Sequence, residues 1–308
     1  MYWLRGAVVS LGVFFLVYAA LSVIIACVWT LVGRKYPPRS DAALYGIRVA
    51  PLFGACALVA LFTVPSFLYL EPRFTDETIG AGAIALAVGA AGVLVAGCFN
   101  AARAWLKTAR FVAACLAQAR RPEMPAGIPA YEVLGGAPMF CVSGVWRPKL
   151  LVSSGVVALL DAVEIEAAIR HEVAHVQRKD NLKKLVLRFC PFPALASLER
   201  EWSRAAEIAA DDDAVCHEHT ALDLASALLK MARVSAQART PEIGMTLIPE
   251  NGAPLSTRVE RLLAWKHSQR QGRRHLQWAL LVGALVGVGL NYAWALAQMH
   301  EFTELLVR

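Results

Sequence analysis

Four long stretches of this chain contain no charged residue, and their positions divide it into parts. Residues 7–32, 49–70 and 79–99 lie in the first third, and residues 276–297 lie near the end. Each stretch is long enough to cross about 30 Å of hydrocarbon as an α-helix, which takes about 20 apolar residues. The pattern therefore predicts four membrane-spanning helices.

By this division, residues 1–100 hold three transmembrane helices and residues 276–297 form the fourth. The mixed segment between them, residues 101–275, is long enough for a folded domain. Its first part, residues 100–121, carries five basic residues among large apolar ones. This mixture predicts an amphipathic helix that continues from the third span along the membrane surface. Residues 298–308 remain as a short tail.

Prolines interrupt the second predicted span. Pro51 and Pro65 both lie inside residues 49–70. A proline inside a helix removes one backbone hydrogen bond and bends the helix. We expect kinks at both positions, with neighbouring helices providing partners for the freed carbonyl groups.

The mixed segment begins with a pattern that is typical of short strands. Tyr131–Leu134, Met139–Val142 and Leu150–Ser153 are apolar runs of four residues that are separated by glycine-containing turns. Such runs between turn signals predict a small β-sheet. By contrast, residues 239–254 contain several prolines and glycines and predict a loop.

A helical pattern follows in Glu164–Asn181. Asp161 and Glu164 have the form of a capping box, in which each side chain accepts a hydrogen bond from the other residue's backbone. The apolar residues recur three or four positions apart and share one face: Ile165, Ile169, Val173 and Val176. The spacing predicts a helix that packs this face against the rest of the domain.

Another face of this helix carries His171-Glu172-Val173-Ala174-His175, an H-E-x-x-H pattern. Residues i and i+4 of a helix are neighbours, so His171 and His175 can bind one Zn²⁺. Glu172 lies beside them and would be the general base for the water that the metal activates. Because short motifs also occur by chance, the alternative is a solvated helix face.

The third ligand is expected from a second predicted helix, Glu199–His217. A catalytic zinc site needs three protein ligands and one open position. Glu207 and Asp211 share a face of this helix, so Glu207 can bind the metal while Asp211 orients a ligand histidine. The alternative is a solvated acidic helix. His217 and His219 are rival ligands, but their spacing places them on different helix faces.

These motifs resemble those of known membrane proteases. H-E-x-x-H followed by Glu207-Ile-Ala-Ala-Asp211 is similar to the motif pair of the membrane-bound gluzincins. Gly144-Val-Trp-Arg-Pro148, the strand-like Lys149–Ser153 and the helix that ends in Arg178-Lys-Asp-Asn181 are similar to the BlaR/MecR type of integral-membrane metallopeptidase. By motif, the resemblance covers about residues 130–265.

The resemblance implies an α-helical membrane protein with an α+β gluzincin (zincin) domain inserted between the third and fourth transmembrane helices. It implies cleavage of a protein or peptide in signal transduction, such as a transcriptional repressor or the chain itself. In a gluzincin an edge strand holds the substrate by β-addition. Arg258 lies where related proteases have a P-L-x-x-R-I-like stretch, so we expect it to contact the substrate or the oxyanion.

The sequence departs from the BlaR/MecR pattern after the fourth span. Those sensors carry an extracellular penicillin-binding domain there, whereas this sequence stops at Arg308. We therefore expect the signal to come from a separate membrane partner or through the membrane helices themselves.

Composition and charge agree with a membrane protein. The chain is 57% hydrophobic, which is too apolar for an ordinary soluble enzyme. The formal charge of +7 would suit a nucleic-acid binder, but the basic residues gather beside the apolar stretches, as in cytoplasmic loops. We expect the bacterial cytoplasmic (inner) membrane, with the N-terminus outside and the protease in the cytoplasm. The seven scattered cysteines predict reduced thiols.

Two other functions fit the same motifs. One is a housekeeping quality-control protease for membrane proteins, of the HtpX kind. The other is a non-catalytic membrane scaffold or receptor that retains the zinc fold. Glu172 argues against the scaffold, because a scaffold has no use for a general base.

Overall fold

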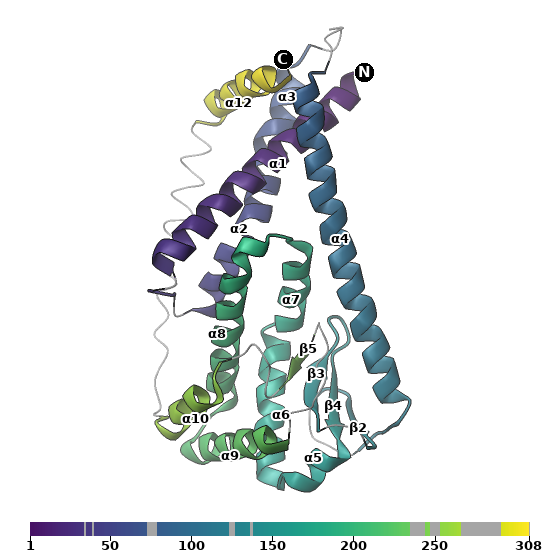
Figure 1. Ribbon diagram of the computed structural model, residues 1–308, viewed down its shortest axis with the longest axis vertical. Coiled ribbons are helices and arrows are strands. Elements are labelled where there is room, and N and C mark those ends of the chain that lie inside the picture. The colour runs from purple at the N-terminus through teal and green to yellow at the C-terminus, as the bar shows by residue number, and fades with distance from the viewer. Residues whose placement is uncertain are drawn as a thin grey trace. The chain divides into compact units, whose positions relative to one another are not determined.

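A computed structural model covers the chain and describes these residues: 1–33, 35–38, 40–72, 79–122, 127–135, 138–234, 244–246, 253–265 and 291–307. The structure is mostly helical, with one small mixed sheet (Figure 1). It divides into two compact units. The first unit contains Met1–Val28, Val49–Val95 and Ser268–Arg308; the second contains Trp29–Arg48 and Ala96–His267.

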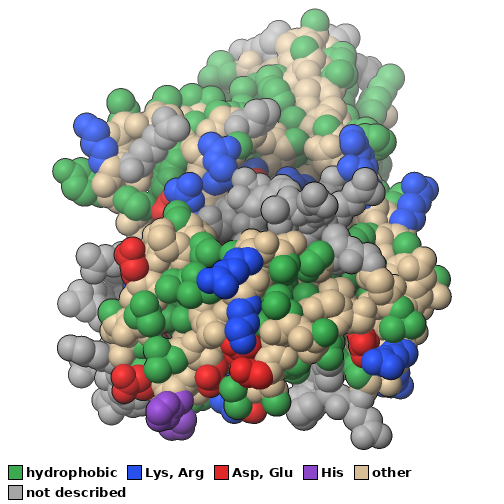
Figure 2. Space-filling model, turned by 60° about the horizontal axis from the view of Figure 1, so that its bottom comes forward, with side chains coloured by type: hydrophobic (Ala, Val, Ile, Leu, Met, Phe, Trp, Pro, Cys, Tyr) green, Lys and Arg blue, Asp and Glu red, His purple; other side chains and the backbone are tan. Residues whose placement is uncertain are grey.

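Three helices in the described part of the chain are long and apolar enough to cross a membrane: Tyr2–Gly33, Asp41–Leu70 and Ala81–Leu116. They include the three spans predicted within residues 1–100. Many of their large apolar side chains are exposed, among them Ile24, Phe53 and Val95. Figure 2 shows hydrophobic side chains over much of the face that it presents. Apolar surface of this extent indicates a membrane protein.

The second of these helices contains both predicted irregularities. Helix α2 (Asp41–Leu58) includes Pro51, and a π-helical turn, Val59–Thr63, separates it from α3 (Val64–Leu70), which contains Pro65. Proline has no N–H, so Pro65 leaves the carbonyl of Leu61 without its helical partner. The hydroxyl of Tyr292 donates a hydrogen bond of 2.7 Å to that carbonyl. A neighbouring helix thus compensates for the proline, as expected.

The first and third helices differ in detail from the predicted spans. Helix α1 (Tyr2–Val28) begins earlier than predicted and continues as a π-helical turn, Trp29–Gly33. Helix α4 (Ala81–Leu116) unites the third span with most of the predicted amphipathic segment. The amphipathic helix was expected to reach Arg121, but Ala119–Arg120 form strand β1 instead. This correction arises because these two residues pair with the sheet.

The predicted fourth span, residues 276–297, lies for the most part outside the described residues. The described part of this region contains helix α12, Tyr292–Val307. Residues 298–307, which we expected to form a tail, are therefore helical. Thr303 is buried there, and Leu306 packs against Val9 and Val13 of α1.

The second unit contains a five-stranded sheet with the order β1-β2-β4-β3-β5. Its three inner strands match the three predicted runs: β2 (Ala130–Val133), β3 (Phe140–Ser143) and β4 (Lys149–Ser153). Strand β2 is parallel to β4, and the other pairs are antiparallel. The edge strand β5 (Gly244–Thr246) corrects the prediction of a loop over residues 239–254. A strand of three residues is too short to show alternation in the sequence.

Helices cover both faces of this sheet (Figure 1). Alternate residues of a strand point to opposite faces. Phe140 and Val142 pack into a core with helices α6 (Ala162–Gln177) and α9 (Glu218–Val234). Cys141, which lies between them in β3, packs with the C-terminal part of α4. The sheet therefore fixes the position of α6 from one side.

Helix α6 begins as predicted and ends earlier than predicted. The capping box of Asp161 and Glu164 is confirmed, and so is the apolar face of the helix. The helix stops at Gln177 rather than Asn181, because Lys179 takes a left-handed conformation with φ of 58°. A new helix, α7 (Asp180–Phe189), begins directly after it. This break turns Asp180 towards the histidines.

The remaining helices of the second unit are short. Helix α5 (Ser154–Leu159) precedes α6, and a 3₁₀ turn, Pro193–Leu195, precedes α8 (Ala196–Ala214). Helix α10 (Leu255–Leu263) packs on α8 and α9. In α9, Met231 lies in the core, which confirms the interpretation of that residue as structural.

Candidate metal centre

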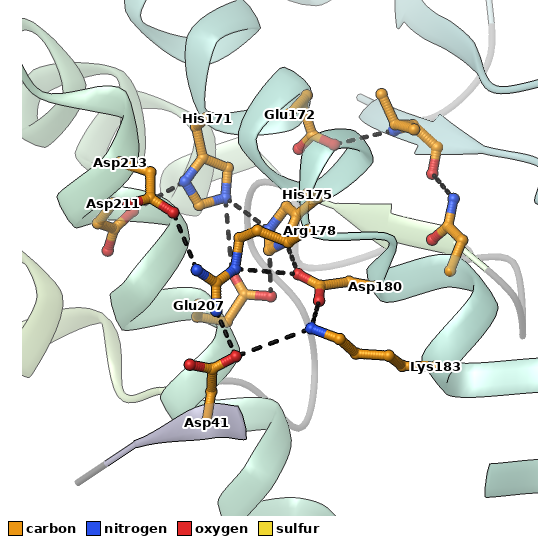
Figure 3. A network of polar contacts seen from close by, with 12 residues as sticks. Asp41, His171, Glu172, His175, Arg178, Asp180, Lys183, Glu207, Asp211 and Asp213 are labelled. Atoms are coloured by element: carbon orange, nitrogen blue, oxygen red, sulfur yellow. Dashed lines mark hydrogen bonds and ion pairs between the residues drawn. The ribbon is translucent and has the colours of Figure 1, made fainter. Parts of the chain in front are cut away.

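Two buried histidines of α6 point towards the same place. His171 and His175 are one helical turn apart, and their Nε2 atoms lie 3.1 Å from each other. Both side chains are almost completely inaccessible to solvent. Figure 3 shows the two rings meeting beside Glu207.

Glu207 approaches this place from helix α8. Its carboxylate oxygens lie 3.6 Å from Nε2 of His171 and 3.8 Å from Nε2 of His175. Together the three residues offer donor atoms that all lie within 4.8 Å of one another. The packing of α8 on α6 therefore brings two nitrogens and a carboxylate together from separate parts of the sequence.

The contacts of these donors fit a metal ion. Both carboxylate oxygens of Glu207 are buried and have no hydrogen-bond partner among the described residues. Nη1 of Arg258 lies 3.2 Å from Oε2, but a buried carboxylate that accepts no hydrogen bond is costly. The two Nε2 atoms face each other, although neutral imidazole nitrogens in this position would repel unless one carried a proton. A divalent cation bound by all three residues would satisfy every one of these atoms.

Two aspartates hold the far sides of the imidazole rings. Oδ1 of Asp211 lies 2.9 Å from Nδ1 of His171, and Oδ2 of Asp180 lies 2.9 Å from Nδ1 of His175. An acceptor at Nδ1 keeps the proton there and leaves the Nε2 lone pair free for a metal. Asp211 was a sequence-predicted candidate for this contact. Asp180 was missed, because only the left-handed turn at Lys179 brings it back to the histidine.

The histidines differ in their electrostatic surroundings. Burial acts to lower the pKa of His171, but the contacts with Asp211 and Glu207 outweigh burial and raise this pKa to about 9. For His175, burial dominates and lowers the pKa despite the contact with Asp180. A metal that binds here must therefore displace a proton from His171 at neutral pH.

Arg258 of α10 has a different position from the one expected for a substrate contact. It is only 2% exposed, and its Nε and Nη2 donate hydrogen bonds of 2.7 and 2.6 Å to Asp211. Its Nη1 lies 3.2 Å from Oε2 of Glu207. Burial acts to raise the pKa of Asp211, but the charges and hydrogen bonds of Arg258 and His171 together outweigh burial and hold that pKa well below its usual range. The guanidinium thus holds the carboxylate that orients His171.

The other aspartate is held by a network that extends to helix α2 (Figure 3). Lys183 donates a hydrogen bond of 2.8 Å to Asp180, and Nε of Arg178 lies 3.6 Å from the same carboxylate. Arg178 also contacts Asp41, the first residue of α2, and Asp213 of α8. Nζ of Lys183 lies 3.8 Å from Asp41. A charged residue of α2 is therefore connected to a donor histidine through two cations.

Glu172 faces the sheet beside the donor residues. Its Oε2 accepts a hydrogen bond of 2.9 Å from the backbone N–H of Val142 in β3. Its Oε1 is buried and has no hydrogen-bond partner among the described residues. Burial raises the pKa of Glu172 to about 8, although the charge of His171 acts to lower it. The carboxyl group is thus held by one oxygen and leaves the other available for a proton.

A hydrogen bond holds the end of β3 beside the candidate metal centre. Nδ2 of Asn181 donates a hydrogen bond of 2.9 Å to the carbonyl of Gly144. Gly144 has φ of 105°, a conformation that side-chain-bearing residues rarely adopt. This contact helps to fix β3, which in turn holds Glu172. His217 and His219, the rival ligands, are both exposed and lie outside the cluster.

Comparison with known families agrees with this geometry. Residues 133–262 match the model of the BlaR1 peptidase M56 family. This part of the chain is therefore similar to the peptidases of the BlaR/MecR type. The matched range includes both histidines, Glu172, Glu207 and Arg258. The family consists of membrane-associated metallopeptidases, in accord with the three apolar helices and the three clustered donors. A search of curated proteins gave no match.

Proposed function

We propose that the chain is an integral membrane zinc endopeptidase that cleaves a protein or peptide on the cytoplasmic side of the membrane. The observation that carries the proposal is the convergence of two histidine nitrogens and the Glu207 carboxylate beside an unpartnered oxygen of Glu172. Two nitrogens and one carboxylate form a donor set that catalytic zinc sites use.

In this proposal His171, His175 and Glu207 hold Zn²⁺. When bound, the metal activates water and polarises the carbonyl of the scissile peptide bond. Asp211 and Asp180 keep the proton of each imidazole on Nδ1, so both Nε2 atoms remain available. Glu172 carries out the proton transfers.

Glu172 takes up a proton at Oε1 and passes it to the leaving amine. The backbone N–H of Val142 holds Oε2, so the carboxylate has a fixed direction. Its raised pKa of about 8 suits this exchange, because a group with a pKa near the working pH both accepts and donates protons efficiently.

An extended substrate would lie along the sheet edge nearest to the site. Strand β5 is the edge strand on the side of β3, and it packs against α6 and α7. Such an edge offers backbone groups that can pair with a peptide. We infer that the substrate binds there as an additional strand, which directs its peptide bond towards Glu172.

The membrane helices and basic loops support a role in signalling at the inner membrane of a bacterium. We place the N-terminus outside and the peptidase in the cytoplasm, because the loops beside the second unit are basic. A transcriptional repressor or the chain itself is the proposed substrate. A separate membrane sensor, or the membrane helices, would supply the signal, with no direct binding of nucleic acid.

The test compares cells that carry the wild type, Glu172→Gln and a control variant, Glu166→Gln. Glu172→Gln keeps the hydrogen bond to Val142 but cannot accept a proton, so proteolysis should fall about 10²–10⁴-fold while zinc stays bound. Glu166 lies on the exposed side of the same helix, paired with Arg170, so its variant should behave as wild type. Proteomics of the three strains identifies fragments that only the active forms produce.

The same experiment separates the proposal from its alternatives. A fragment derived from one regulatory protein supports signalling, whereas fragments from many membrane proteins support quality control. If Glu172→Gln transmits the signal as well as the wild type, cleavage is not the function. The chain would then act as a scaffold.

A further inference from the structure

A basic cavity lies in the second unit, away from the candidate metal centre. It has a volume of about 480 Å³ and is lined by residues of α2, α4, the end of α7 and the start of α8. Three of its lining residues are arginines, Arg48, Arg103 and Arg188, and one is an acid, Glu199. Three positive charges against one negative charge leave an excess of two. A cavity of this charge attracts anions.

The most buried of these arginines is held in place and is not fully satisfied. The side chain of Arg48 is 4% exposed, and its Nη2 donates a hydrogen bond of 2.7 Å to the carbonyl of Cys190. Its Nε is buried and has no hydrogen-bond partner among the described residues. A phosphate oxygen in the cavity would provide the missing acceptor.

Glu199 neutralises only part of the charge. Its carboxylate lies 3.8 Å from Arg48 and 3.5 Å from Arg188, so one acid is shared by two guanidinium groups. Arg103 lines the same cavity from α4 and is exposed. Both Arg103 and Arg188 therefore have donors that face solvent and can turn to a ligand.

The sequence positions of two lining arginines indicate that this cavity lies at the edge of the hydrocarbon. Arg48 is the last charged residue before the uncharged stretch 49–70 of the second candidate span. Arg103 is the first charged residue after the uncharged stretch 79–102 of the third. Arginines at the ends of membrane helices lie at the level of the lipid headgroups. Two helices thus bring such arginines into one cavity.

The peptidase side of the cavity is closely packed and partly apolar. Pro191 and Phe192, from the turn between α7 and α8, line it. The backbone of α4 approaches α7 so closely at Gly97 that an added Cβ would lie 2.4 Å from the carbonyl oxygen of Phe189. This contact packs α4 against the end of α7 beside the cavity. Apolar walls beside arginines suit a ligand with a phosphate and a glycerol–acyl portion.

We propose that this cavity binds the phosphate headgroup of an anionic phospholipid from the cytoplasmic leaflet. The phosphate would bind Arg48, Arg103 and Arg188, and the glycerol end would contact Pro191 and Phe192. Basic pockets between membrane helices on the cytoplasmic side are suited to such headgroups. The bound lipid would fasten the turn that joins α7 to α8. These helices carry Asp180 and Glu207 of the metal centre.

The test uses the purified full chain in nanodiscs of phosphatidylcholine, with or without phosphatidylglycerol. Native mass spectrometry should show that the wild type retains phosphatidylglycerol in preference to phosphatidylcholine. Arg103→Gln should reduce that preference about fivefold, which is the effect of one basic side chain near an anionic surface. Arg103 is exposed, so this variant should fold; Arg48→Gln should have a larger effect where it folds.

The matched control is Arg110→Gln, because Arg110 is exposed on the same helix but does not line the cavity. It should leave the lipid preference unchanged. An equal loss in both variants would show general surface attraction and overturn the proposal.

A second measurement compares the thermal stability of the chain in pure phosphatidylcholine, with millimolar inorganic phosphate added, with its stability in discs that contain phosphatidylglycerol. If phosphate stabilises the chain as much as phosphatidylglycerol does, the site binds free anions and the lipid proposal is wrong. None of these readouts depends on proteolysis.

Discussion

Among the described residues, each unit contains a cluster of histidine and glutamate, which is fully buried in the second unit and only partly buried in the first. The second unit has His171, His175 and Glu207; the first has Glu71, His300 and Glu304. In both clusters the donor atoms lie within 4.8 Å of one another. By proximity alone, both would be candidate metal sites.

The two clusters differ in the position of the nearest arginine. In the first unit, Nη2 of Arg5 lies 2.5 Å from Glu71 and 3.2 Å from Glu304, so a cation already occupies the place between the carboxylates. In the second unit, Arg258 makes its two shortest contacts with Asp211, which itself contacts the far side of His171. Its Nη1 also lies 3.2 Å from Oε2 of Glu207, so the guanidinium supports an orienting residue and contacts one donor, while the two Nε2 atoms lie 3.1 Å from each other.

We infer that such a cluster favours a metal where the nearest arginine makes its shortest contacts with an orienting carboxylate rather than with the candidate ligands. An arginine among the carboxylates completes an ion pair and satisfies their charge. An arginine whose shortest contacts are with the orienting carboxylate satisfies the charge of the candidate ligand carboxylate less completely.

The largest expected effect is the loss of metal from one cluster only. His175→Ala should remove the roughly one zinc per chain that a three-ligand site implies. The matched change in the first unit, His300→Ala, should leave the zinc content unchanged. Metal analysis of both purified variants measures this directly. Zinc that is retained by His175→Ala but lost from His300→Ala would reverse the assignment of the two clusters.

The sequence was sufficient to predict which side chains meet at the candidate metal centre, for a physical reason. His171 and His175 lie four residues apart, and so do Glu207 and Asp211, and helical geometry places such residues on one face. The inner strands of the sheet were predictable from their apolar runs and turns. The capping box likewise located the start of α6.

The other parts of the fold and of the candidate site depended on tertiary contacts, which the spacing of residues along the sequence does not encode. Asp180 reaches His175 only because Lys179 takes a left-handed conformation. Asp41 and Arg178 are separated by more than a hundred residues and meet through tertiary packing. For Arg258, the motif indicated that the residue belongs to the site but not which way its guanidinium points. Strand β5 exists only through its backbone pairing with β3.

A second prediction concerns the arginine behind the donors. Asp211→Asn and Arg258→Gln should each weaken metal affinity about 10–100-fold, because outer partners of ligand histidines have effects of this size. Competition with a chelator of known affinity measures the change. Proteolysis should persist in part when zinc is supplied in excess.

The same two helices provide a matched control for this prediction. Arg261 of α10 contacts Asp212 of α8 at 3.1 Å, and both side chains are largely exposed. Asp212→Asn and Arg261→Gln therefore remove a neighbouring ion pair of the same kind without touching a histidine. These variants should bind zinc as the wild type does. Equal weakening in both pairs would indicate that helix packing, rather than the orientation of His171, controls affinity.

A third prediction concerns pH. The pKa of His171 is raised to about 9 in the metal-free site, so this residue is protonated at neutral pH and must lose that proton to bind a metal. Metal affinity should therefore rise with pH by about tenfold from pH 7 to 8 and level off above pH 9, since one proton is displaced. In Asp211→Asn one of the contacts that raise this pKa is lost, so the rise should level off at a lower pH than in the wild type. A flat profile in the wild type would contradict the assignment of His171 as a ligand.

The smallest expected effect comes from the most distant residue, Asp41 in the first turn of α2. It contacts both Arg178 and Lys183, the two cations that hold Asp180 against His175. Asp41→Asn should weaken metal affinity only about two- to fivefold, the range of a partly exposed ion pair. Asp41→Glu should restore it. Asp213→Asn is the control, since Asp213 also contacts Arg178 but belongs to α8.

If Asp41→Asn weakens metal binding and Asp213→Asn does not, α2 influences the metal centre through Arg178 and Lys183. Helix α2 continues into the second candidate membrane span, so a movement of that span would reach His175 through this network. A cobalt-substituted sample reports the change independently of proteolysis, because its visible spectrum depends on how the ligands are oriented. Identical spectra for the wild type and Asp41→Asn, with identical affinities, would show that the network only stabilises the fold. A shifted spectrum that Asp41→Glu returns to normal would identify Asp41 as a residue that positions His175 from the membrane helix.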